Sequence, residues 1–87
     1  MKIAVWDTYV IRENGLKMHF DILVPDKMND EATIFNYGRK YLKDKPFETG
    51  NLSTNECAFC HVEKATQSVE DDIIKKGFSI IEMENCN

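Results

Sequence analysis

The run from Cys57 to His61 holds the side chains best suited to chemistry, because it has the form C-x-x-C-H. Thiolates at this spacing can bind one tetrahedral zinc ion, and a histidine or a further thiolate can complete the ligand set. The sequence therefore predicts a zinc site made by Cys57, Cys60, His61 and Cys86, with His19 as an alternative ligand. No second C-x-x-C pair is present, so the remaining ligands must come from single residues far apart in the chain.

Other interpretations of the same run stay open. A thiol redox pair or a thiol-dependent hydrolase would use Cys57 or Cys60 as nucleophile and His61 or His19 as base, which leaves enzymatic activity undecided. Covalent haem attachment also uses C-x-x-C-H, but it normally requires export, so we do not expect haem. Alternatively, the cysteines are small buried apolar side chains beside a core Phe59, and the chain is a homodimeric interaction module built on an exposed edge strand.

A second candidate polar site depends on how the first two strands pair. A two-residue turn would place Asp7 on the buried face without a partner, at a high cost in free energy. A three-residue loop with a bulge at its glycine avoids this cost, so we predict the loop Glu13–Gly15. This register places Tyr9 opposite His19 and Asp7 opposite Asp21 on the other face of the sheet.

The facing carboxylates of Asp7 and Asp21 would repel each other. A cation, a shared proton or a hydrogen-bonding histidine between two carboxylates relieves such repulsion, and each arrangement occurs at metal sites or acid–base sites. The alternative is an exposed sheet face, on which Lys17 and solvent screen the charges and His19 packs flat against Tyr9.

Periodicity and turn signals predict the elements that position these residues. Leu16–Val24 alternates apolar and polar residues and pairs with Lys2–Ile11, with Trp6 and Phe20 on the buried face. A helix capped by Asn29 or Asp30 is expected next, followed by a loop over Pro46–Asn55 and a strand from about Glu56. A second helix is expected to begin at a Ser68 cap and end at Gly77, with Val69, Ile73 and Ile74 on its inner face. The last expected strand covers Phe78–Met83.

The resulting order ββαβαβ predicts the fold class α+β. A strand, helix and strand of this length favour a right-handed parallel crossover, so we expect a mixed four-stranded sheet covered by two helices. Gly38 lies within the apolar stripe of the first helix, where a missing side chain lets helix and sheet approach closely. We expect a single compact domain over residues 1–87.

Composition excludes several kinds of partner. The chain has 11 Lys and Arg against 15 Asp and Glu, for a net charge of −4, and no basic cluster that would neutralise a row of phosphates. Nucleic acid is therefore not an expected partner. No apolar run approaches the ~18 residues of a spanning helix, and the N-terminus lacks the features of a signal peptide. We expect no membrane partner and a cytoplasmic location, where the three cysteines stay reduced.

Four segments resemble the DUF2024 family of small bacterial proteins: Val5–Tyr9, His19–Asp21, Glu56–His61 and Met83–Cys86. They occur in order along nearly the whole chain. The resemblance implies a compact α/β fold and a bacterial origin, and it carries over no catalytic or binding residue, because the function of the family is unknown. From the residues themselves, the leading hypothesis is a small accessory domain that binds a divalent metal, with zinc as the expected ion.

Overall fold

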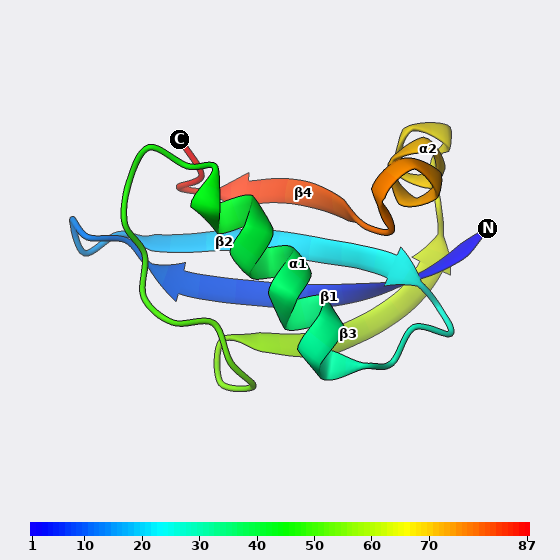
Figure 1. The fold of residues 1–87 in the computed structure, drawn as a ribbon, viewed down its shortest axis with the longest axis horizontal. Helices are drawn as coiled ribbons and strands as arrows, with labels where there is room; N and C mark the ends of the chain where they lie inside the picture. Colours follow the sequence, from blue (N-terminus) through cyan, green and yellow to red (C-terminus); the bar gives the residue numbers. More distant parts are fainter.

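The first two strands form a hairpin at the centre of the sheet in the computed structural model, which describes residues 1–87 (Figure 1). Strand β1 spans Lys2–Ile11 and strand β2 spans Lys17–Pro25, and the two pair antiparallel. The loop that joins them is Glu13–Gly15, and its glycine has a φ of +86°, a left-handed conformation that glycine adopts at little cost. The predicted loop and register are confirmed.

Strands β3 and β4 add to opposite edges of this hairpin. Strand β3 (Cys57–Lys64) pairs antiparallel with β1, and β4 (Ser79–Glu84) pairs antiparallel with β2, so the strand order is β3-β1-β2-β4. The prediction of a mixed sheet with a parallel crossover is therefore wrong. That prediction treats β3 and β4 as neighbours, whereas the hairpin lies between them and each outer strand takes one of its two free backbone edges.

Helix α1 spans Glu31–Lys43 and lies along one face of the sheet (Figure 1). A Cβ atom at Gly38 would lie 2.6 Å from Leu52 Cδ1 and 2.9 Å from Ile22 Cδ1, so the missing side chain lets the helix approach the sheet as predicted. The core on this face combines alternate hairpin residues with helix, loop and edge residues: Ala4, Trp6, Val10, Met18, Phe20, Ile22, Val24, Ile34, Phe35, Leu42, Leu52, Cys57, Phe78 and Cys86.

Helix α2 spans Gln67–Lys76 and packs against one end of the opposite face of the sheet. Its cap is Thr66, whose hydroxyl accepts a hydrogen bond from the Val69 amide, and not Ser68 as predicted. Gly77 ends the helix in the left-handed conformation, as expected. Ile74 is 72% exposed, so its predicted place on the inner face is wrong. The small second cluster consists of Ile3, Val5, Leu23, Val69 and Ile73.

The short length of α2 leaves most of its face of the sheet uncovered. Ile3 and Val5 lie under the helix, but the residues that follow on the same face of β1, Asp7 and Tyr9, extend beyond it. The two helices therefore cover opposite faces to very different extents. Neither helix has the length and apolar character that crossing a membrane would require.

Candidate metal site on the open face of the sheet

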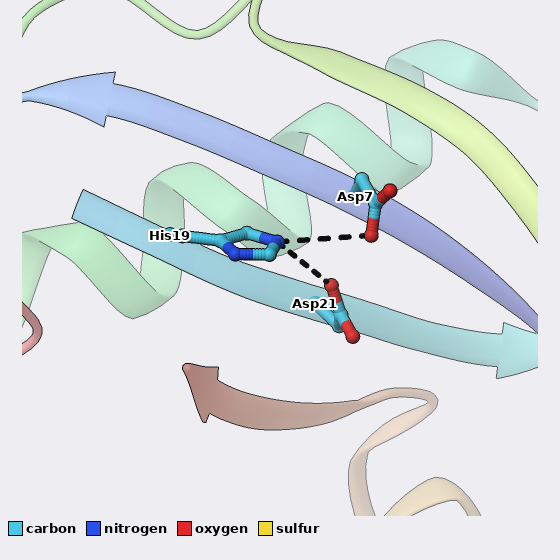
Figure 2. A group of neighbouring side chains, drawn as sticks. All are labelled: Asp7, His19 and Asp21. Atoms are coloured by element: carbon cyan, nitrogen blue, oxygen red, sulfur yellow. Dashed lines mark ion pairs between the residues drawn. The ribbon is translucent and has the colours of Figure 1, made fainter. Parts of the chain in front are cut away.

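Three side chains converge on the uncovered part of the sheet, beyond α2 (Figure 2). Asp7 lies directly opposite Asp21 in the hairpin register, and His19 precedes Asp21 by two residues on the same face. His19 Nε2 lies 3.4 Å from Asp21 Oδ1 and 3.7 Å from Asp7 Oδ1. One ligand atom from each residue falls within 4.8 Å of the others, a spacing that one small ion could bridge.

The imidazole of His19 is held in place by Tyr9. The two rings stack with centroids 4.1 Å apart and an angle of 15° between their planes. This is the packing that the sequence offered as the alternative to a functional site, and it also fixes the direction in which Nε2 points. The stack leaves only 16% of the His19 side chain exposed, compared with 38% for Asp7 and 15% for Asp21.

Two polar atoms of this cluster are buried without a hydrogen bond. They are His19 Nε2 and Asp21 Oδ1, which face each other across the site. Figure 2 marks the two atoms as an ion pair at 3.4 Å, which holds when the imidazole is protonated; with a neutral imidazole, both buried atoms lack a partner. A cation between them would bond to both atoms at once.

The negative charge of Asp7 disfavours a second negative charge on Asp21. Burial, together with the hydrogen bond and negative charge of Asp7, raises the pKa of Asp21 to about 6, against the opposing effect of His19. Asp21 therefore exchanges a proton close to neutral pH. A cation bound between the carboxylates would replace that proton and remove the repulsion between them.

The C-x-x-C run lies within β3, and this divides its cysteines between the two faces of the sheet. Cys57 is buried in the core beneath α1, where the Thr8 hydroxyl donates a hydrogen bond to its sulfur at 3.3 Å. Cys60 is exposed on the open face, where the negative charge of Asp7 acts on its thiol. Residues three apart in a strand face opposite sides, so the two sulfurs cannot bind one ion.

Cys86 lies just beyond β4, at the other edge of the sheet from β3. It is buried, and its single S–H is shared between the carbonyl oxygens of His19 at 3.3 Å and Glu84 at 3.4 Å. The predicted zinc ligands Cys57, Cys60, His61 and Cys86 are therefore not brought together. The hairpin separates the strand of the first three from the strand of the fourth.

A bulge in β3 adds functional groups to the open face. Asp7 pairs with Ala58, but Val5 pairs with His61, so Cys60 is an additional residue at the shift in register. The shift places His61 on the face of Cys60, with its Nδ1 3.1 Å from the Cys60 sulfur. No feature of the sequence signals this bulge.

His61 also contacts an acidic residue that the sequence analysis did not select. Its Nε2 lies 2.6 Å from Glu63 Oε1. Alternation alone would put Glu63 and His61 on the face opposite Cys60, and the shift in register reverses this. The result is a chain of three contacting side chains along the outer strand.

Neither Cys57 nor Cys60 has the lowered pKa of a reactive thiol. Burial raises the pKa of the Cys57 thiol, and the Thr8 hydrogen bond only partly opposes the shift. Desolvation and the Asp7 carboxylate raise the pKa of the Cys60 thiol. Because Cys60 is exposed, the charge of Asp7 is the cause with the clearer structural basis. Nucleophilic cysteines are activated by the opposite shift, so these pKa directions do not favour the thiol-enzyme hypothesis.

Fold and site together define a small α+β domain with an antiparallel four-stranded sheet and an aspartate–histidine cluster on its open face. A family model described as Domain of unknown function (DUF2024) matches residues 1–83, and the chain belongs to this family. Among solved structures, the chain is similar to the NMR structure of protein NE1680 from Nitrosomonas europaea. The two share 33% sequence identity with a TM-score of 0.80, and all of both chains is covered. No curated protein matches the chain.

Proposed function

We propose that this chain is a divalent-cation-binding domain whose ligands are Asp7, His19 and Asp21. The distances between the ligand atoms carry the proposal. Ligands bonded to a tetrahedral ion at about 2.1 Å stand about 3.4 Å apart. The distances from His19 Nε2 to the two carboxylate oxygens are 3.4 and 3.7 Å, so only small adjustments separate the cluster from a coordination sphere.

The surroundings of the cluster support an ion of this kind. The three ligands project from paired strands at the centre of the sheet, and Tyr9 holds the imidazole, so little conformational entropy is lost on binding. The buried His19 Nε2 and Asp21 Oδ1 atoms, which make no hydrogen bond, gain a metal bond, and the repulsion between the carboxylates disappears. Binding therefore relieves two unfavourable features of the folded protein.

The surface around the site favours a small ion over an organic substrate. The three cavities of the molecule lie elsewhere: beside the loop after α1, between α1 and β4, and near the N-terminus. None of them is lined by Asp7, His19 or Asp21. A binding or accessory role accounts for this arrangement better than turnover of a substrate does, because ligand sites are normally concave.

Isothermal titration calorimetry on protein purified without a histidine tag tests the proposal. We expect one divalent ion per chain, with zinc and manganese as the probes, and loss of that binding in His19→Ala and in Asp21→Asn. Asp26→Asn is the matched control, because Asp26 is exposed in the turn after β2 and distant from the site in the register of the hairpin. Absence of binding by the unaltered chain, or equal binding by all variants, would contradict the proposal.

A further inference from the structure

The place of Cys60 beside the aspartate–histidine cluster extends the proposed cation site. Ala58 lies directly opposite Asp7, and Cys60 follows two residues later in the same outer strand. Side chains at such diagonal positions are within reach of each other across a pair of strands. The negative charges of Asp7 and Asp21 act on the Cys60 thiol, whose sulfur lies outside the group of ligand atoms within 4.8 Å of one another and would turn toward the ion on binding.

From this placement we infer that Cys60 is a fourth ligand, and that its sulfur makes the site selective for zinc over hard cations. This inference rests on the proposed cation site. Two carboxylates and one imidazole accept zinc, manganese and magnesium with modest discrimination, whereas a thiolate favours zinc and related soft or borderline ions. One sulfur, one nitrogen and two oxygens satisfy the tetrahedral number that zinc prefers.

Cys60 can approach such an ion without a rearrangement of the core. Its side chain is exposed and lies on an outer strand at the point where the bulge interrupts regular pairing. Bulges often redirect side chains next to functional sites, and here the bulge would direct the Cys60 side chain toward the cation site. The other cysteine of the C-x-x-C run, Cys57, lies in the core on the opposite face and cannot take the same place.

His61 and Glu63 lie where they can hydrogen-bond and orient a metal-bound Cys60 thiolate. His61 Nδ1 lies 3.1 Å from the Cys60 sulfur; when the ring is an imidazolium, Nδ1 donates a hydrogen bond to the thiolate while Nε2 donates one to Glu63. Glu63 contacts the other ring nitrogen at 2.6 Å and orients the imidazole. Groups that hold a ligand in this way raise metal affinity without touching the ion. His61 and Glu63 are therefore positioning residues in this inference.

Cobalt is a spectroscopic probe for this coordination sphere. We expect Co²⁺ bound to the unaltered chain to show a thiolate-to-cobalt charge-transfer band in the near ultraviolet. Cys60→Ser should still bind Co²⁺ through the other three ligands but lose the band, and Cys57→Ser, the matched control, should keep it. Because Cys60 is exposed, its replacement leaves the core intact.

Affinity measurements give the second readout. Cys60→Ser should lower zinc affinity by at least the ~100-fold that the loss of a residue supporting a ligand can cause, because Cys60 is itself a ligand in this inference, and leave manganese affinity unchanged. Zinc should also protect Cys60 of the unaltered chain from alkylation, as mapped by mass spectrometry.

The outcomes separate this inference from the proposed function. If ions bind and depend on His19 and Asp21, but zinc affinity is the same in Cys60→Ser and no thiolate band appears, the inference is overturned and the three-ligand site stands. If the unaltered chain binds no divalent ion, both are overturned. Persistence of the band in Cys60→Ser would assign the sulfur to another cysteine and would also overturn the inference.

Discussion

The two faces of the central hairpin are built from alternate residues of the same two strands, yet they have opposite characters. On one face, α1 and the loop after it cover a continuous apolar core that includes Phe20, which has no exposed surface. On the other face, the short helix α2 covers one end only, and Asp21 lies in a partly exposed polar cluster. Neighbours in the sequence therefore occupy different dielectric environments. The comparison shows how one hairpin can stabilise the fold with one set of side chains and leave the other set free for ion chemistry.

The largest effect should come from the closed face. Phe20→Ala removes a ring from a fully covered site where Tyr41 also packs against it, with ring centroids 4.7 Å apart. We expect the free energy of unfolding to fall by about 3–5 kcal/mol, as measured by urea denaturation. Tyr9→Ala, on the open face, is the control and should cost less than about 1 kcal/mol. Equal losses in the two variants would remove the distinction between the faces.

Asp21→Asn should have the opposite sign, although residue 21 follows residue 20 in the chain. The folded protein holds the pKa of Asp21 at about 6, above the ordinary aspartate value of 3.8. The folded state therefore binds more protons than the unfolded state between these values, and the free energy of unfolding falls as pH rises from about 4 to about 6. Because asparagine does not titrate, the free energy of unfolding of the variant does not fall in this way as pH rises.

In buffer with a chelator at pH 7.5, we expect Asp21→Asn to be more stable than the unaltered chain by about 1 kcal/mol, after a reduction for solvent screening of a partly exposed group. The advantage should shrink toward pH 4. Urea denaturation at several pH values measures both. A variant that is less stable at pH 7.5 would show that neither burial nor repulsion by Asp7 disfavours the Asp21 carboxylate in the folded state.

The smallest effect on stability is expected at Ile74. Comparing it with Ile73 tests how much of the open face α2 covers. Its side chain is 72% exposed, whereas Ile73 contributes to the small cluster under the helix. Ile74→Lys should change the free energy of unfolding by less than about 0.5 kcal/mol, whereas Ile73→Lys should lower it clearly. Thermal unfolding by circular dichroism measures both variants. A large loss in Ile74→Lys would mean that α2 covers more of the face than its contacts indicate.

The pairing within the hairpin was predictable because it depends on residues that are close together in the sequence. Alternation in β2 and the cost of burying Asp7 select one loop, and that loop fixes which residues face each other. The pairing of Asp7 with Asp21 and of Tyr9 with His19 follows directly. The role of these residues as cation ligands stays a proposal.

The strand order was not predictable in the same way. Whether β3 pairs with β1 or β4 depends on which backbone edge each strand meets in three dimensions, and alternation within a strand carries no information on that choice. The error in the predicted parallel crossover follows from this gap.

The failure of the C-x-x-C prediction has a different cause. The sequence placed a strand near Glu56, and within a strand Cys57 and Cys60 must face opposite sides. Applying that alternation to the predicted strand would have excluded a shared zinc ion. The bulge that gathers Cys60 and His61 on one face, in contrast, leaves no signal in the residues and needs the register to reveal it.

The central position of the hairpin has a consequence for the order of events during folding. All three proposed ligands lie between positions 7 and 21, joined by a short loop, so the entropy lost in bringing them together is small. Contacts that are local in the sequence form faster than the pairing of distant strands. We therefore expect the aspartate–histidine cluster to assemble when the hairpin forms, before β3 and β4 join its edges. The Cys60 sulfur, which arrives with β3, would reach a site whose other ligands are already in place.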